Sequence, residues 1–535
     1  MLAELLFPEI KQIPQDIIAK YPKRPVWQVV TRIAPSPTWF FHIWTLYSTL
    51  VDEIFAHKND GILYLRSEDT DQKREIDWAM KKYVDILKIF WLDFDEWPIW
   101  SKYEDVGNYW PYTQSQREYI YKVFLKDLVD KGVAYPCFLT EDEINDIRST
   151  QESLKAPTWI YNEYSPWRNA SFDDVKKALY DKKEFVIRYK SEWNMFKKIE
   201  VLDMIKWNIN IWENFLDIVI MKVSGLPTYH FAHIIDDYLM WTTLILRWDE
   251  WFASLPLHLQ MFETMNWTPP KYAHVWPLVK IDGNSRRKLS KRKDDEANVE
   301  YYFKAWYLPE AIIDFLCNLI NAWYEDWRKL NLHSHYRDFD FKLEKMNTAW
   351  ALVDIDKLNF VNASFIKNMD LELLYTKLEK YLIEFELDFY NNIFSKTDKN
   401  YNLKIIKELQ TRLTRFEEFI PLTTFFYNDF DINDNVIKLL INEKMKIENL
   451  DIVKKWLYLA LDIISVNKDE FNSIEEIKNA FVEKIKEALM KNWQVLWPVR
   501  VALSGEEFSP WALELIYILW KEKSIQRIKK VLKFI

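Results

Sequence analysis

The pattern of apolar and polar residues near the start of the chain predicts a β-loop-α-β unit. Residues 26–33 are rich in β-branched side chains and predict a strand. Residues 45–58 place apolar side chains at helical spacing, namely Leu46, Leu50, Ile54 and Phe55. A second strand is predicted at 61–66 and another helix at about 74–90. This order is typical of the beginning of a parallel, nucleotide-binding sheet.

The pattern then changes twice along the chain. Residues 1–25 are polar and punctuated by prolines, and we expect them to form an N-terminal extension. Residues 111–225 have a mixed pattern and predict an insertion, because sheet-like runs resume at DIVIMKV, residues 217–223, and TTLILR, residues 242–247. From residue 364 onward the chain is almost entirely amphipathic helix. We therefore expect an α/β region followed by an all-α region.

Length, charge and cysteine content limit the class of protein. The 535 residues are enough for about three or four domains. The net charge of −9 disfavours a generally basic nucleic-acid binder but allows a local basic patch. Two cysteines, Cys137 and Cys317, cannot form a disulfide framework or a four-cysteine zinc site, so we expect small buried thiols in a cytoplasmic protein. The sequence has neither the pattern of a signal peptide nor an apolar run of about 18–20 residues. We therefore expect no membrane partner.

Glycine and tryptophan occur in unusual numbers. The chain has 6 glycines and 27 tryptophans among its 535 residues. Together these 33 residues are roughly 6% of the chain, which is close to the usual share of glycine alone, about 7%. We hypothesise that many of these tryptophans are glycines in the organism.

The segment TRIAPSPTWFFHIWT, residues 31–45, is the first candidate for chemistry. A strand that ends in a Pro-Ser-Pro turn and opens a helix directs backbone N–H groups and the positive helix end toward one point, where phosphates bind. His42 lies at the start of that helix and can donate to a phosphate oxygen. A single histidine beside a helix is more often structural.

The segment RRKLSKRKDD, residues 286–295, is the second candidate. Alone, it is best interpreted as a solvated charged loop. A flexible lysine loop can also close on a triphosphate and neutralise the charge that develops as pyrophosphate leaves. The two segments together, about 250 residues apart, predict an adenylate-forming enzyme.

The two segments resemble the ATP-binding motifs of class I aminoacyl-tRNA synthetases, His-Ile-Gly-His and Lys-Met-Ser-Lys-Ser. Here they read His42-Ile43-Trp44-Thr45 and Lys288-Leu289-Ser290-Lys291-Arg292. The runs RIAPSPT, LYLRSEDTD, YTQSQR, PTYHFAHIIDDYLM, LILRWDEW and KLSKRKD are similar, in sequence and order, to bacterial glutamyl-tRNA synthetases. The resemblance extends from about residue 26 to the end of the chain.

The resemblance implies a Rossmann-type catalytic domain with an inserted α/β domain and an all-α C-terminal region. Its halves would be residues 26–110 and 226–284, on either side of an acceptor-stem-binding domain at 111–225. Residues 285–363 would form a stem-contact region with the KLSKR loop, and residues 364–535 an anticodon-binding region.

The resemblance also implies the roles of single residues. The glutamate pocket would be lined by Arg32, Ala34, Ser36, Glu68, Tyr229 and Arg247, with His233 where the family usually has asparagine. Glu68 can hold the substrate ammonium, and each arginine can face a carboxylate. We expect Arg247 to select glutamate over glutamine, because a guanidinium buried against a neutral amide is costly. The catalytic group would be His42, Lys288 and Lys291, and the ATP site would add Trp44, Thr45 and Ser290.

The implied reaction joins L-glutamate to the 3′ terminal adenosine of tRNA(Glu) through glutamyl-adenylate, with ATP and Mg²⁺. Whether tRNA(Gln) is also charged stays open. Some relatives carry zinc near the position of Cys137, but the remaining ligands are absent, so we expect neither zinc nor another metal site. We expect a monomer.

Three alternatives remain. A short paralogue that modifies another tRNA lacks the helical C-terminal half, which this chain has. Glutaminyl enzymes share the fold, but Arg247 and the APSPT loop favour glutamate. Taken literally, the bulky Trp39, Trp44, Trp241 and Trp248 would block the site and leave a degenerate tRNA-binding protein.

Eight tryptophans stand where the family has glycine: Trp39, Trp44, Trp91, Trp97, Trp241, Trp248, Trp306 and Trp520. Trp251 and Trp267 stand where the family has tryptophan. The hypothesis is that the gene uses UGA as a glycine codon and that this sequence reads UGA as tryptophan. The DNA codons at these ten positions decide between the hypothesis and the degenerate protein.

Overall fold

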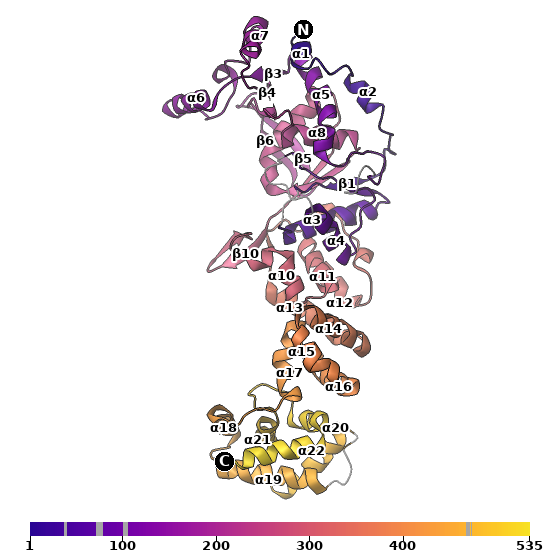
Figure 1. Cartoon of the computed structure of the whole chain (residues 1–535), viewed down its shortest axis with the longest axis vertical. Helices are drawn as coiled ribbons and strands as arrows, with labels where there is room; N and C mark the ends of the chain where they lie inside the picture. The colour runs from indigo at the N-terminus through magenta and orange to yellow at the C-terminus, as the bar shows by residue number, and fades with distance from the viewer. Residues whose placement is uncertain (37–39, 71–78, 100–104, 467–470, 472) are drawn as a thin grey trace. The chain divides into compact units, whose positions relative to one another are not determined.

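The computed structural model describes residues 1–535 except 37–39, 71–78, 100–104, 467–470 and 472. The chain divides into two compact units, which are described separately (Figure 1). Unit 1 comprises Met1–Glu300 and Ile313–Asp354. Unit 2 comprises Tyr301–Ile312 and Ile355–Ile535. The finer division into six segments stays a prediction.

The β-loop-α-β unit predicted near the start of the chain is confirmed. Strand β1 (Val30–Ile33) pairs in parallel with β2 (Ile62–Leu65), and α3 (Ile43–His57) connects them. The strand predicted from residue 26 begins four residues later. Helix α4 (Ala79–Ile89) occupies the end of the helix predicted from about residue 74, whose start lies outside the described residues.

A second sheet of unit 1 has the strand order β6-β5-β9-β8. Strands β8 (Leu244–Trp248) and β9 (Lys271–Val275) run in parallel, and the hairpin of β5 (Lys198–Asp203) and β6 (Trp207–Trp212) extends the sheet beside β9. The hairpin comes from the predicted insertion, yet it completes the sheet of β8. The β8 end of this sheet lies beside β1, because Thr243 N donates to Val30 O over 3.0 Å.

The predicted insertion also forms a small antiparallel sheet of its own, in the order β3-β4-β7. Its strands are Ala134–Cys137, Val186–Tyr189 and Val219–Met221. A fourth sheet, β11-β10-β12, consists of Ser285–Lys288, Leu278–Asp282 and Ala351–Leu352. The remaining longer helices of the segment from 118 to 330 are α5 (Glu118–Asp130), α6 (Glu141–Ser153), α7 (Phe172–Tyr180), α8 (Tyr229–Leu239), α9 (Leu255–Thr264), α10 (Val299–Lys304), α11 (Pro309–Ile320) and α12 (Tyr324–Leu330).

Residues 1–25 differ from the polar extension that their composition suggests. They contain two short helices, α1 (Leu2–Leu6) and α2 (Pro14–Ile18). Four of their apolar side chains, Ala3, Phe7, Ile10 and Ile17, are buried in one core with α5 and α8. Other apolar side chains of the segment, Leu2, Leu6, Ile18 and Tyr21, are partly buried against the same core.

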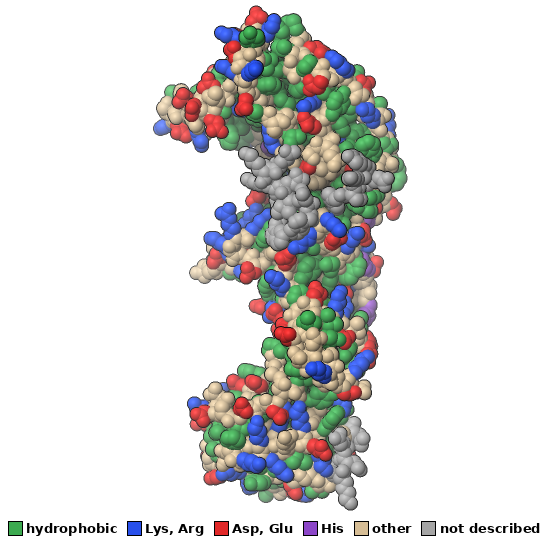
Figure 2. Space-filling model, in the orientation of Figure 1, with side chains coloured by type: hydrophobic (Ala, Val, Ile, Leu, Met, Phe, Trp, Pro, Cys, Tyr) green, Lys and Arg blue, Asp and Glu red, His purple; other side chains and the backbone are tan. Residues whose placement is uncertain are grey.

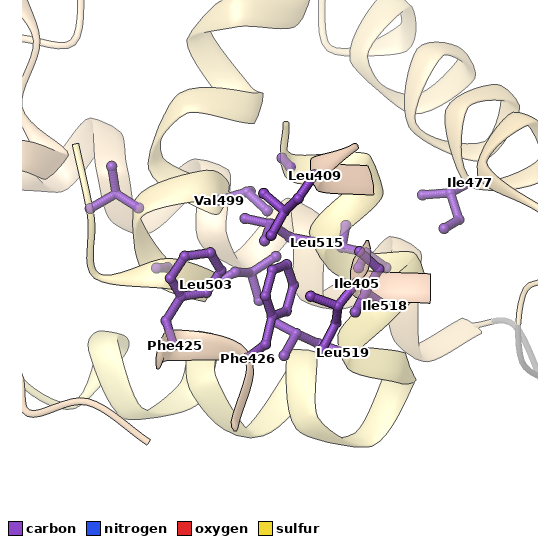
Figure 3. Packing of buried hydrophobic residues seen from close by; sticks show 14 of the residues in the cluster. Ile405, Leu409, Phe425, Phe426, Ile477, Val499, Leu503, Leu515, Ile518 and Leu519 are labelled. Atoms are coloured by element: carbon purple, nitrogen blue, oxygen red, sulfur yellow. The ribbon is translucent and has the colours of Figure 1, made fainter. Parts of the chain in front are cut away.

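Unit 2 is helical throughout its described residues, as predicted for the region from residue 364. Its helices include α13 (Ile355–Asn368), α14 (Leu371–Phe385), α15 (Leu387–Asn392), α16 (Lys399–Leu409), α17 (Phe419–Tyr427), α18 (Asp434–Leu440), α19 (Leu450–Val466), α20 (Ile474–Glu487), α21 (Asn492–Ser504) and α22 (Ala512–Leu532). Figure 3 shows part of their common core, where Leu409, Val499 and Leu515 point toward one another. Within the described ranges, no helix is both long and apolar enough to cross a membrane.

Several tryptophans adopt a backbone conformation that suits glycine. Among the described residues, twelve non-glycine residues have positive φ, and five of these are tryptophan. Four belong to the eight suspected positions: Trp91 (φ 58°), Trp241 (59°), Trp306 (50°) and Trp520 (62°); the fifth is Trp207 (62°). Trp520 interrupts α22 with ψ 168°, a combination that is essentially restricted to glycine. Trp39 lies outside the described residues.

Backbone strain gives the glycine hypothesis a stability test. Trp91 is 44% exposed and follows α4 with positive φ, so its indole contributes little packing to offset the strain. We expect Trp91→Gly to raise the free energy of unfolding by about 1 kcal/mol, since a non-glycine residue in this region costs roughly 1–3 kcal/mol. Urea denaturation measures the change.

The matched control is Trp267→Gly. Trp267 stacks on Tyr238 with ring centroids 3.7 Å apart and has no positive φ. We expect this change to lower stability by about 3 kcal/mol or more, as truncation of a packed indole does. Destabilisation of similar size by both substitutions would contradict the hypothesis.

Candidate active site

A cavity of about 480 Å³ in unit 1 collects most of the predicted site residues. Its walls include eight of them: Arg32, Ala34, Ser36, Trp44, Thr45, Glu68, Tyr229 and Arg247. The other predicted residues, His42, His233, Lys288, Ser290 and Lys291, are not part of its wall. The cavity lies at the carboxyl ends of β1, β2 and β8, which is where open parallel sheets bind ligands.

A network of buried charges lies behind this wall. Asp237 Oδ1 accepts from Arg66 Nη1 at 2.7 Å and from Arg32 Nε at 3.4 Å. Although burial alone would raise it, the pKa of Asp237 is held well below its usual range by Arg32 and Arg66. Arg66 Nη2 also donates to Glu68 Oε1 at 3.1 Å. The network thus fixes two wall residues, Arg32 and Glu68, through one carboxylate on α8.

A second ion pair extends the network. Arg117 Nε donates to Asp236 Oδ1 at 2.7 Å, and Arg66 Nε lies 3.7 Å from Asp236 Oδ2. Sequence reasoning did not single out Arg66, Asp236 or Asp237. The available signal was two adjacent aspartates within the apolar run FAHIIDDYLM, because buried carboxylates are rarely left without a cation.

Glu68 is a largely buried carboxyl group that pairs with Arg66. Burial raises its pKa to about 7, although Arg66 and Arg32 act in the opposite direction. A cation bound in the cavity would favour the ionised form. Glu68 is therefore suited to an ammonium group.

Arg247 presents an unsatisfied donor. The side chain is buried on β8, and its Nε and Nη1 atoms contact the imidazole nitrogens of His274 and His258 at 2.9 and 3.0 Å. Its Nη2 atom is buried without a hydrogen-bond partner among the described residues. A planar guanidinium with an unpartnered nitrogen suits a carboxylate.

Tyr229 and His233 form the neighbouring surface. Their rings stack with centroids 5.4 Å apart on successive turns of α8. His233 Nδ1 lies 2.7 Å from Asp237 Oδ2, without the alignment of a hydrogen bond. Burial lowers the pKa of His233 to about 4, so its ring is neutral at pH 7.

The two predicted phosphate-binding segments meet in the fold. Phe41 O accepts from Val299 N at 3.0 Å, which joins the start of α3 to the chain just beyond the lysine loop. Burial, with the nearby charges of Lys291 and Lys288, lowers the pKa of His42 to about 4. His42 Nδ1 accepts from Trp44 N at 2.9 Å, so the ring proton resides on Nε2. His42 is therefore neutral, with a proton on Nε2 that can be donated.

The lysines lie on the β10–β11 hairpin and the loop that follows it. Figure 2 shows Lys and Arg side chains gathered around this hairpin. Lys288 pairs with Glu250, and its Nζ lies 4.1 Å from the centre of the Trp248 ring. Lys291 Nζ lies 5.2 Å from the Phe40 ring, and burial lowers its pKa. Ser290 contributes its backbone N–H to Asp294, which shapes the turn.

These residues fit the phosphate groups of a nucleotide, but two indoles crowd the place beside them. The rings of Trp44 and Trp248 have centroids 3.8 Å apart, and both line the cavity. Each indole occupies about 150–250 Å² of surface that a glycine would leave open. This crowding is what the glycine hypothesis predicts at these positions.

The two cysteines are both buried and free, as predicted. In the part of the chain that the structure describes, no three His, Cys, Asp or Glu side chains form a group that could hold a metal ion.

Comparison with known proteins gives consistent matches over nearly the whole chain. Residues 28–359 match the family of "tRNA synthetases class I (E and Q), catalytic domain", and residues 373–532 match the "Anticodon binding domain". Glutamate–tRNA ligases of Clostridium perfringens and Acetivibrio thermocellus are 36% and 35% identical, each aligned over 99% of both chains. The crystal structure of a glutamate tRNA ligase from Elizabethkingia meningosepticum, in complex with its amino acid, has a TM-score of 0.79. It is 27% identical and covers 95% of this chain and 99% of its own.

The buried network predicts a large penalty for removing its central charge. We expect Asp237→Asn to lower the free energy of unfolding by about 3–5 kcal/mol, because Arg32 and Arg66 would lose their shared carboxylate. The control is Asp340→Asn, which breaks an exposed pair with Lys58 and Lys342. We expect that change to cost less than about 1 kcal/mol. Equal small losses in urea denaturation would show that the network contributes little.

Proposed function

The chain belongs to the glutamate–tRNA ligase family of class I synthetases, and on that premise we propose how its cavity performs the reaction. The enzyme joins L-glutamate to tRNA(Glu) and, as a class I synthetase, uses ATP. The observation that carries the proposal is the buried Arg247 guanidinium, whose Nη2 has no hydrogen-bond partner among the described residues, in a wall that also holds Glu68 and Arg32.

We infer that glutamate binds by its three charges. Glu68 holds the ammonium group. A bound cation stabilises the ionised carboxylate of Glu68 and so lowers the pKa that burial has raised. Arg32 faces the α-carboxylate, and Arg247 faces the side-chain carboxylate through Nη2. A glutamine amide would leave the Arg247 charge unpaired in a buried site, which is the kind of mismatch that gives large discrimination. Ala34, Ser36, Tyr229 and His233 shape the remaining surface.

The activation step needs no strong base in this arrangement. The α-carboxylate of glutamate is already ionised and attacks the α-phosphorus of ATP in line, releasing pyrophosphate. Lys288 and Lys291 stabilise the charge that develops on the phosphates, and neutral His42 donates a hydrogen bond from Nε2. Trp44, Thr45 and Ser290 complete the nucleotide site, with position 44 occupied by glycine under the hypothesis above. Mg²⁺ would arrive with the nucleotide, and we assign it no protein ligand and expect no zinc.

The second step transfers glutamate to the terminal adenosine of the tRNA, while the helices of unit 2 bind the anticodon. Whether tRNA(Gln) is a second substrate is decided by charging both purified tRNAs with labelled glutamate. Charging of neither tRNA by the eight-glycine chain, defined by glycine at the eight suspected tryptophans, would overturn the proposed site. We propose a monomer that acts in the cytoplasm.

The role of Arg247 predicts a specific change in substrate choice. In the eight-glycine chain, we expect Arg247→Cys to reduce kcat/KM for glutamate at least a hundredfold, because the loss of a charge-assisted contact leaves the substrate carboxylate unpaired. The kcat/KM for glutamine should change much less, so the ratio of kcat/KM for glutamate to that for glutamine falls. Pyrophosphate exchange with each amino acid measures both values. Unchanged glutamate kinetics would rule out this assignment.

Lys291 should act on the transition state rather than on glutamate binding. We expect Lys291→Ala to lower the rate of glutamyl-adenylate formation by at least tenfold, with less than a twofold change in the Kd for glutamate, because the lysine meets charge that grows during the reaction. Rapid-quench kinetics and direct binding separate the two quantities. Lys293→Ala, an exposed lysine of the same loop, is the control. Equal losses in rate and affinity would make Lys291 a binding residue.

A further inference from the structure

The surroundings of Arg247 differ from those of the other arginines at the cavity. Arg32 and Arg66 both contact the Asp237 carboxylate. Among the described residues, no carboxylate forms an ion pair with Arg247. Its partners are two imidazole nitrogens, His274 Nε2 at 2.9 Å and His258 Nδ1 at 3.0 Å. The Tyr272 ring lies 4.8 Å from the guanidinium carbon.

The chemistry of these contacts determines the protonation state of both histidines. A guanidinium can only donate, so the imidazole nitrogens that face it must carry lone pairs. Each ring then has its proton on the other nitrogen. His274 Nδ1 donates that proton to Asp203 Oδ2 at 2.7 Å, and His258 Nε2 donates to His230 Nδ1 at 3.0 Å. Both histidines are therefore neutral and held in one tautomer.

Burial supports the neutral forms. It lowers the pKa of His258 well below its usual range, and Arg247, His233 and His230 lower it further. Burial also lowers the pKa of His274, and the charge of Arg247 adds to this effect, although Asp203 opposes it. The pKa of His230 falls to about 4 for the same two reasons. The histidines consequently add no positive charge beside the arginine.

Neutral acceptors have a different effect on Arg247 from that of a carboxylate. A carboxylate would bind two of the guanidinium nitrogens and compensate their charge before any substrate arrived. Two imidazoles fix the plane of the guanidinium through Nε and Nη1 but leave its charge uncompensated and Nη2 buried without a hydrogen-bond partner among the described residues. A buried cation in this state favours an incoming anion strongly over a neutral amide.

We propose that His258 and His274 are positioning residues that determine specificity by holding Arg247 oriented but uncompensated. The proposal rests on the role of Arg247 in the proposed function. It extends that role to two side chains that do not touch the substrate. His274 comes from β9 and is itself fixed by Asp203 of the β5–β6 hairpin, so a distant hairpin supports the selection of the substrate.

His258 offers a matched pair of variants. His258→Phe keeps a ring but removes the acceptor, whereas His258→Asn keeps an acceptor close to the position of Nδ1. In the eight-glycine chain, we expect His258→Phe to lower kcat/KM for glutamate by about tenfold or more, the size expected for a lost hydrogen bond to a charged group. The loss should appear mainly in KM for glutamate, with KM for ATP unchanged. We expect His258→Asn to stay within about threefold of the parent, and exposed His333→Phe to have no effect.

A double-mutant cycle with Arg247→Cys tests whether His258 acts through the arginine. If it does, His258→Phe should cause no further loss of glutamate activity once Arg247 is absent. Thermal unfolding of each variant identifies loss through misfolding, and the activity of His258→Asn then still tests the proposal. Additive losses in the cycle, or equal losses in the Phe and Asn variants with unchanged melting temperatures, would overturn the proposal for His258.

The cycle also separates this inference from the proposed function. If Arg247→Cys leaves glutamate kinetics unchanged, the role of Arg247 is wrong and the inference falls with it. If Arg247→Cys abolishes glutamate activity while His258→Phe does not reduce it, the role of Arg247 stands, and only the positioning role of the histidines is wrong.

Discussion

The site depends on the cost of burying charge. Removing an ion from water costs several kcal/mol even after the protein relaxes, so each buried charge needs a partner of suitable geometry. Asp237, at the end of α8, meets this need for Arg32 and Arg66 together. Because Arg66 in turn holds Glu68, this one carboxylate connects side chains from β1, the segment after β2 and α8. The arrangement of the cavity wall follows from this requirement.

The cost of burying charge has the opposite consequence at Arg247, which lies in the same cavity wall. Arg247 is buried with neutral partners, and its Nη2 has no hydrogen-bond partner among the described residues, which is why we propose that its charge meets a ligand carboxylate. Glu68 has a pKa raised to about 7, which leaves it ready to gain stability from an ammonium group. The protein thus pairs Arg32 and Glu68 with charges of opposite sign, whereas Arg247 faces only neutral side chains among the described residues. Such preorganised charges act without reorganisation cost when the substrate binds.

Several of the suspected tryptophans fit the structure poorly, for two separate reasons. Trp44 and Trp248 are in ordinary backbone conformations but occupy space beside the phosphate-binding groups. Trp91, Trp306 and Trp520 lie away from the cavity wall but have positive φ, which a Cβ atom disfavours. Under the glycine hypothesis, the crowding and the strain would both disappear. Composition, crowding and backbone conformation each motivate the hypothesis, and the DNA codons test it.

The sequence by itself determined the local elements and the identity of the chemistry. The helical spacing in α3, the β-branched residues of β1 and the long amphipathic run of unit 2 each produce the expected element, because these depend on near neighbours along the chain. Eight residues of the cavity wall, among them Arg32 and Arg247, were also predicted, and that prediction came from the resemblance of the motifs to the synthetase family. Only the tertiary structure decided which groups support them. Asp237 lies about 170 residues from Arg66, and Asp203 about 70 residues from His274. Nothing in local spacing specifies which buried charges will meet, since that depends on how distant strands pair and how helices pack over them.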